Sequence, residues 1–169
     1  MSETFDLILN TKRRKDWDRV LVEGKTVAEI DACNDVQHMV FADGPKSVRD
    51  FSLLRSWRRH PTRCVVASRS VVHASVPATE KYERGEVLSS GFIVEAAGGK
   101  ASRILGGIGG GKKKNNKKKA EAKCRVTYIV QLGPSALRLG IGAITGRSKL
   151  VLENLQRLAS ALRRDRGEE

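Results

Sequence analysis

From Trp17 to about residue 132, the apolar side chains of the chain repeat with a period of two, and this alternation restricts the fold more than any other feature. Turn-forming residues, among them Gly44-Pro45, divide the region into six stretches. The clearest stretch is 63–72, which is rich in β-branched residues and contains neither glycine nor proline. The pattern predicts six strands, at about 20–31, 35–42, 50–58, 63–74, 85–96 and 123–132.

Helical periodicity is confined to the two ends of the sequence. Residues 3–16 are expected to form a short helix, because their first apolar residues fall at positions i, i+3 and i+4. Near the other end, four apolar residues on one stripe predict an amphipathic helix over about 148–164: Val151, Leu155, Leu158 and Leu162. A helix, consecutive strands and a final helix indicate an α+β fold, with a curved antiparallel sheet packed against the long C-terminal helix.

Residues 98–122 differ in composition from the rest of the chain, since glycine-rich sequence leads into a run of lysines. Such a segment predicts a flexible surface loop. The chain carries a net charge of +13, and without the six lysines it would still be 13 − 6 = +7. This surplus favours an anionic membrane surface or nucleic acid as partner and does not choose between them. The candidate anion-binding residues are Lys112, Lys113, Lys114, Lys117, Lys118 and Lys119.

Several classes of protein are disfavoured by the sequence. Three cysteines without a paired spacing give no disulfide framework, which predicts a reducing, cytoplasmic location. We find neither a secretory signal nor an apolar span of about 18 residues, so the expected membrane contact is peripheral. The three histidines lack metal-ligand spacing, and both glycine-lysine matches to a phosphate-binding loop fail. We therefore expect no metal, no cofactor, no catalytic residue and no enzyme activity.

Six short patterns, in the same order as in the family, resemble the START family of lipid-binding domains. They are Lys15–Asp18, Thr26–Asp31, Ser47–Trp57, Arg69–His73, Tyr82–Gly91 and Val126–Gln131. The likeness is strongest to the START domains of Rho-GTPase-activating proteins. It implies a helix-grip fold over residues 3 to about 164, and a lipid or sterol as ligand. On this reading residues 1–169 form a single START-like domain that lacks the first helix and three strands of the family.

One strand carries the most informative site residues. Alternation places Phe51, Leu53, Arg55 and Trp57 on one face, which suits an apolar pocket with one polar anchor. A buried arginine needs a partner, and a lipid head group can provide it; an arginine on the solvent face is the alternative. Some family members pair this arginine with a glutamate on the neighbouring strand, where the counterpart here is expected to be Met39, with no carboxylate near. The predicted lipid-binding residues are Arg55, Phe51, Leu53, Trp57, Met39, Arg69 and Tyr128. For Arg69 and Tyr128, ordinary packing within the sheet is the favoured alternative.

Two further hypotheses concern the ends of the pocket strands and the terminal helix. Arg49-Asp50 is expected to be structural, pinning the loop at Gly44-Pro45. The terminal helix and the segment before it are expected to form a lid that gates the cavity, with Leu137, Leu139, Ile141, Ile144, Val151 and Leu155. The resulting function is a lipid-binding or lipid-transfer module. The alternative is an interaction module that has lost its pocket and uses the basic loop on acidic partners or RNA.

Overall fold

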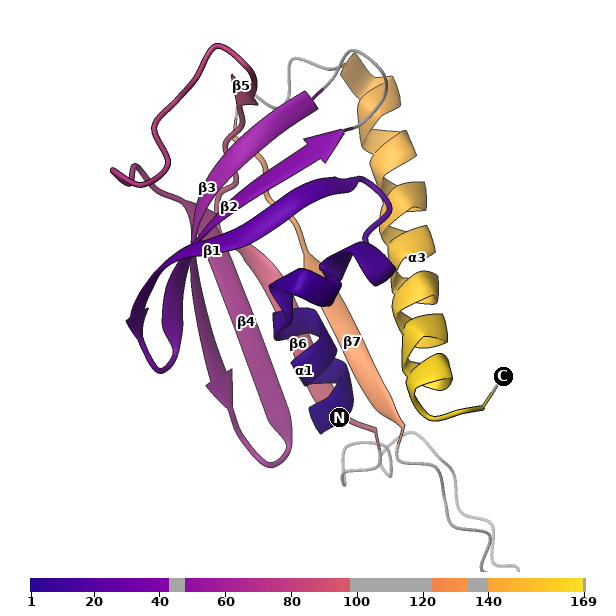
Figure 1. Ribbon diagram of the computed structural model, residues 1–169. Coiled ribbons are helices and arrows are strands. Elements are labelled where there is room, and N and C mark those ends of the chain that lie inside the picture. The colour runs from indigo at the N-terminus through magenta and orange to yellow at the C-terminus, as the bar shows by residue number, and fades with distance from the viewer. Residues whose placement is uncertain (43–47, 98–122, 134–139, 169) are drawn as a thin grey trace, which may run out of the picture.

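The computed structural model describes residues 1–42, 48–97, 123–133 and 140–168, with side chains from residue 149 onward in the last range. In the described part of the chain, helix α1 and a short 3-10 helix are followed by seven strands and helix α3 (Figure 1). The elements are α1 (Ser2–Leu9), η1 (Thr11–Asp16), β1 (Leu21–Asp31), β2 (Asn34–Ala42), β3 (Val48–Arg59), β4 (Arg63–Ser70), β5 (Glu83–Arg84), β6 (Ser90–Ala96), β7 (Cys124–Ile129) and α3 (Gly140–Asp165).

The described strands form one strongly bent sheet in the order β1-β2-β3-β4-β6-β7, and β5 pairs with β3 off this path. All neighbours in the main order are antiparallel, whereas β5 lies parallel to β3. Three register shifts interrupt the β1–β2 ladder, and such irregularities bend a strand. At Gly91 a side chain would place its Cβ 1.9 Å from the Val66 carbonyl oxygen, so only glycine allows β4 and β6 to pair here.

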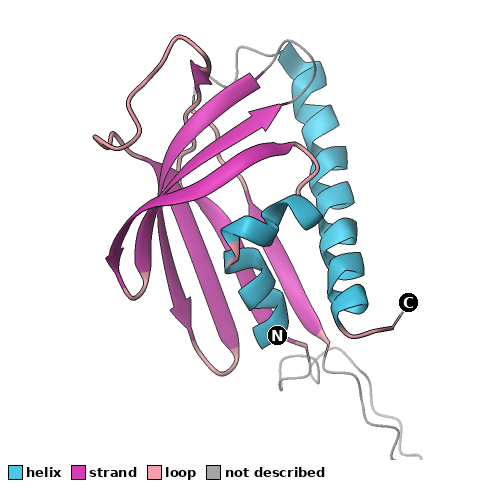
Figure 2. Ribbon diagram, in the orientation of Figure 1, coloured by secondary structure: helices cyan, strands magenta, loops and turns pink. Residues whose placement is uncertain are grey.

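Helices α1, η1 and α3 lie on one face of the sheet, with α3 running along its full height (Figure 2). The main apolar core lies beneath α1 and the C-terminal half of α3, because the buried side chains of these helices meet those of β4 and β6. It contains Phe5, Leu7, Ile8, Trp17, Cys64, Val66, Phe92, Val94, Leu158 and Ala161.

Several boundaries differ from those expected. The N-terminal helix is split at Asn10, whose backbone is extended and whose side chain accepts a hydrogen bond from the Arg13 amide, so a new helix starts there. Strand β4 ends at Ser70, and β6 starts at Ser90 rather than near 85. One further bond after Ser70, from the Val71 amide to the Ser52 carbonyl, continues the β3–β4 pairing, and the chain then leads through β5 to β6. Helix α3 begins at Gly140, eight residues before its expected start, because glycine lowers helix propensity without forbidding a helix.

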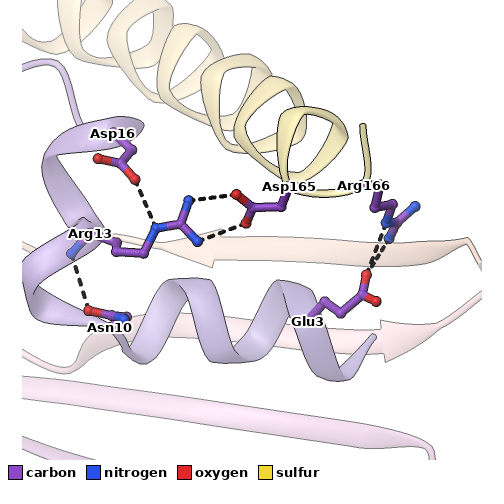
Figure 3. Close-up of polar contacts among 6 residues, drawn as sticks. All are labelled: Glu3, Asn10, Arg13, Asp16, Asp165 and Arg166. Carbon is purple, nitrogen blue, oxygen red and sulfur yellow. Dashed lines mark hydrogen bonds and ion pairs between the residues drawn. The ribbon is translucent and has the colours of Figure 1, made fainter. Parts of the chain in front are cut away.

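The C-terminal end of α3 is fastened to the N-terminal helices by exposed ion pairs (Figure 3). Arg13 donates two hydrogen bonds to Asp165, at 2.7 and 2.9 Å, and a third to Asp16 at 2.9 Å. At the next residue along the chain, Arg166 pairs with Glu3 at 2.8 Å. Each such pair contributes little stability alone, but together they fix which end of the helix is held.

Candidate functional site

A second apolar cluster lies on the same face of the sheet as the helices, apart from the main core. We call it the apolar patch: Leu21, Met39, Phe41, Phe51, Leu53 and Val87. Its residues come from β1, β2 and β3 and from the segment before β6. The rings of Phe41 and Phe51 meet edge to face, with centroids 5.6 Å apart. Phe51 and Leu53, two of the three apolar residues predicted on the pocket face of β3, thus lie in one patch with Met39.

Arg55 lies next to this patch and is buried, with 8% of its surface exposed. Its Nε and Nη2 donate to the two carboxylate oxygens of Asp35, at 2.9 and 2.5 Å. Its Nη1 donates to the Leu9 carbonyl at the end of α1, at 2.7 Å. The Gln37 amide oxygen, oriented toward the guanidinium, accepts from Nη1 and Nη2 as well. The arginine therefore joins β3, β2 and α1, and its charge is compensated by the protein itself.

The expectation that Met39 stands opposite Arg55 with no carboxylate near is wrong. Residue 35, and not residue 39, is the direct cross-strand neighbour of Arg55, and it is an aspartate with 4% of its surface exposed. Met39 instead pairs with Phe51. The sequence interpretation missed Asp35 because it took Met39, from the family resemblance, as the counterpart of the glutamate. Residue 39 lies four positions from residue 35, and such an even shift leaves the same side chains on the same face.

Trp57 and Tyr128 lie on the inner face, but at the border of the main core and not in the apolar patch. The Trp57 ring centroid lies 5.2 Å from the Arg55 guanidinium. Tyr128 stacks on Phe92 with ring centroids 4.2 Å apart. Burial raises the pKa of the Tyr128 phenol, and the charge of Arg14 opposes this shift without cancelling it.

The structure contradicts the prediction that Arg69 lines the pocket. It is exposed and stands opposite Leu54 in the β3–β4 ladder, whereas Arg55 stands opposite Ser68. Adjacent residues on a strand point to opposite faces, so Arg69 lies on the outer face of the sheet. The family-like pattern located the strand and gave no information about the direction of this side chain.

The predicted lid is described only in part. Val151 and Leu155 are half-buried on α3, and Leu155 packs against the main core. Ile141 and Ile144 belong to the helix, but their side chains lie outside the described part, as do residues Leu137 and Leu139. The six lysines of 112–119 also lie outside the described residues.

A polar network that the sequence did not reveal lies on the outer face of β2 and β3. The Asp50 carboxylate accepts hydrogen bonds at 2.9 and 2.8 Å from Arg84 on β5, and lies 3.0 Å from His38 Nε2. Burial raises the pKa of Asp50, but the bonds from Arg84 and His38 outweigh it and lower that pKa overall. The structural role expected of Asp50 therefore involves β5, while its expected partner loop, 43–47, lies outside the described residues.

Ser52, His38 and Asp50 come together on this outer face, which raises the question of hydrolytic chemistry. His38 stands directly opposite Ser52 in the β2–β3 ladder. The Ser52 hydroxyl is buried, with 1% of the residue exposed, and has no hydrogen-bond partner among the described residues. A nucleophile needs both a bond to its base and access to a substrate, so this grouping is not arranged for acyl transfer. Trp17 Nε1 is the second buried group without a partner in the described part of the chain.

Two further findings concern the described residues alone. They contain no group of three or more His, Cys, Asp or Glu side chains that could hold a metal ion. No described helix combines the length and the apolar character that crossing a bilayer requires.

A bent antiparallel sheet held by one long C-terminal helix, with an apolar patch on the gripped face, is the architecture of a helix-grip ligand-binding domain. The sequence model of the START domain matches residues 2–135. The chain belongs to the START family, whose members generally bind or transfer lipids. The family and the fold expected from the sequence are both confirmed.

Solved structures show the same fold at low sequence identity. Human STARD10 superposes with a TM-score of 0.72 at 19% identity, covering 96% of this chain and 58% of that one. Human StAR-related lipid transfer protein 5 gives 0.73 at 15%, covering 98% and 71%. The lipid transfer and protein localization domain of human StarD13 (DLC2) gives 0.64 at 21%, covering 93% and 68%.

Two curated relatives from Mus musculus correct one expectation. An acetyl-coenzyme A thioesterase is 28% identical over 157 residues, covering 88% of this chain and 24% of the relative. Acyl-coenzyme A thioesterase 11 is 29% identical over 109 residues, covering 61% and 18%. The chain thus spans about a quarter or less of these relatives. Both are named as enzymes, so the prediction that the protein is not an enzyme is wrong. The absence of known catalytic motifs from 169 residues was not sufficient evidence for that prediction.

Proposed function

We propose that this chain holds one lipid with an acyl chain between the apolar patch and helix α3. The observation that carries the proposal is the apolar patch itself, a cluster separate from the main core on the face that α3 covers. The names of the curated relatives, acetyl- and acyl-coenzyme A thioesterases, favour an acyl group as the ligand. The START family supports a lipid more generally.

Affinity in this proposal comes from the hydrocarbon part of the ligand. Burying a methylene group contributes about 0.8 kcal/mol, so about ten methylenes contribute on the order of 8 kcal/mol before the cost of association. Arg55 contributes less than the sequence suggested, because Asp35 already neutralises it. The ion pair then forms a polar border of the site and does not demand an anionic head group.

Helix α3 gates this site in the proposal. Its C-terminal end is held by Arg13 and Arg166, and its middle by Asn154, which donates to Asp18 at 3.0 Å. These contacts all fall on α3 or the residue directly after it, within the part whose side chains the structure describes, from residue 149 onward. In the proposal the C-terminal half stays in place and the N-terminal part of the helix moves. We further propose a cytoplasmic protein with peripheral membrane contact, in which the lysines of 112–119 attract anionic lipid.

The test is uptake of a fluorescent fatty acid by the purified chain, with the stoichiometry read by native mass spectrometry. We expect one ligand per chain. Phe41→Ala and Val87→Ala shorten half-buried side chains of the apolar patch. Each is expected to weaken uptake about tenfold, because about one to two kcal/mol of buried apolar contact is lost. The matched controls are Ile30→Ala and Val72→Ala, which trim exposed apolar residues and leave uptake unchanged. Equal effects of both pairs, or no uptake by the unmodified chain, would refute the proposal.

A further inference from the structure

Several separate segments of the chain meet at one end of the molecule, the lower end in Figure 1. The β3–β4 hairpin and the end of β6 are joined by a hydrogen bond from the Ala96 amide to the Thr62 carbonyl, 3.2 Å. The Ala97 amide donates to the Lys123 carbonyl before β7, at 2.9 Å. Helix α1 links the hairpin to the end of α3, since its Asp6 pairs with Arg59 and its Glu3 with Arg166.

Basic side chains outnumber acidic ones at this end. The carboxylates of Glu3, Asp6, Glu95 and Asp165 are each engaged in an ion pair with an arginine. Glu95 stands between Arg63 and Arg125 in the sheet and forms its ion pair with Arg63. Four exposed basic residues make no salt bridge with another described residue. We call them the basic end: Lys123, Arg125, Arg163 and Arg164.

The sequence adds further positive charge near this end. Residues 98–122 leave the sheet after Ala97 and return at Lys123, both of which lie there. Lys119 is four residues from Lys123, so a fully extended chain allows a separation of at most about 14 Å between their Cα atoms. The lysine run therefore ends close to Lys123 along the chain, and its charge has the same sign as that of the basic end.

We propose that the basic end docks the protein on the surface of an anionic lipid bilayer. The choice of a lipid bilayer as the partner rests on the lipid-binding function proposed above. Single-stranded nucleic acid fits less well, because its binding sites combine basic residues with exposed aromatic rings. The basic end contains no aromatic residue, and Tyr128, three residues from Arg125 on β7, stacks on Phe92 and packs against the main core. A bilayer needs only matched charge, and each lysine or arginine near it strengthens binding about fivefold.

The experiment is co-sedimentation of the 169-residue chain with vesicles of phosphatidylcholine containing about one third phosphatidylserine. Replacing the four residues of the basic end by glutamine is expected to weaken binding at least about 50-fold, from about fivefold per residue with allowance for non-additivity. The matched control removes the same charge from exposed residues elsewhere, through Lys25→Gln, Lys81→Gln, Lys149→Gln and Arg69→Gln. This control is expected to lose less than about fivefold, because its charges lie away from the docked surface.

Each outcome supports or overturns the docking proposal. Loss in the basic-end variant alone supports it. Equal loss in both variants, retained binding in the basic-end variant, or no binding by the unmodified chain overturns it. Tighter binding to an RNA oligomer than to the vesicles, with the same dependence on the basic end, overturns it in favour of a nucleic acid partner. Fatty-acid uptake is measured on the same variants and is expected to stay unchanged, so failure of docking and failure of the lipid-holding function give different results.

Discussion

Breaking the buried Arg55–Asp35 pair should destabilise the protein far more than breaking an exposed pair. Their side chains are 10% and 5% exposed, and two hydrogen bonds join them. Removing one partner of a buried pair costs about 3–5 kcal/mol, since the other charge stays buried without compensation. We expect about 3 kcal/mol for Asp35→Leu, because Arg55 keeps the Leu9 carbonyl and Gln37. A typical domain is stable by only about 5–15 kcal/mol, so this loss is readily measured.

The assay is a double-mutant cycle read by urea denaturation, with Asp35→Leu, Arg55→Met and the double variant. The double variant buries no charge and is expected to recover most of the loss, giving a coupling free energy of at least about 2 kcal/mol. The matched control is Arg63→Met with Glu95→Leu, a pair whose side chains are 61% and 31% exposed. Its coupling should stay below about 1 kcal/mol. Equal coupling in the two cycles would refute the reasoning that burial gives the Arg55 pair its strength.

Three further predictions follow from other contacts. The pKa of Asp50 is lowered in the folded state from 3.8, so its stabilising contribution is present above that value and is lost as the pH falls through the folded pKa. Asp50→Asn should therefore make the free energy of unfolding depend less on pH below about 4. An unchanged slope of that free energy against pH would contradict this prediction. A Cβ on Gly85 would lie 2.3 Å from Phe51 Cε1, so Gly85→Ala should cost about 1–3 kcal/mol in urea denaturation and also weaken fatty-acid uptake. Arg13→Gln should speed amide hydrogen exchange near Asp165 while leaving global unfolding nearly unchanged, since this pair is exposed; unaltered exchange would show that the pair does not hold the helix end.

The layers of the fold could be predicted from the sequence because they depend on periodicity. Alternation identified the main strands, and the stripe through Leu158 identified the terminal helix, since both patterns report which side chains are buried. The same alternation correctly grouped Phe51 and Leu53 in one cluster. Arg69 was placed in the pocket by the family-like pattern, whereas alternation with the buried Cys64 and Val66 puts it on the opposite face.

Partners across strands were harder to predict, because they depend on register. In the β2–β3 ladder the residue numbers of each pair sum to 90, as in 34 + 56 and 42 + 48. Placing Met39 opposite Arg55 gives 39 + 55 = 94, a slip of four residues, and an even slip keeps each side chain on its face. Burial patterns are therefore the same in both registers and cannot separate them.

Turn chemistry could have decided between these two registers. A hairpin whose pairs sum to 90 is centred on position 45, the proline of Gly44-Pro45, whereas a sum of 94 centres it on Ser47. The second centre would draw the β-branched Val48 into the turn and move the proline toward the ladder, where it has no amide hydrogen to donate. Glycine and proline at the centre favour a turn, so the first register is the better one on local grounds.

The register that turn chemistry selects also satisfies the buried charge. It places residue 35, an aspartate, opposite residue 55, an arginine. An oppositely charged pair facing each other on buried strands is strongly favoured over an unpaired arginine, because the arginine would otherwise lose its hydration without gaining a partner. Local turn preference and long-range charge pairing therefore select the same register, and either one would have located Asp35 beside Arg55.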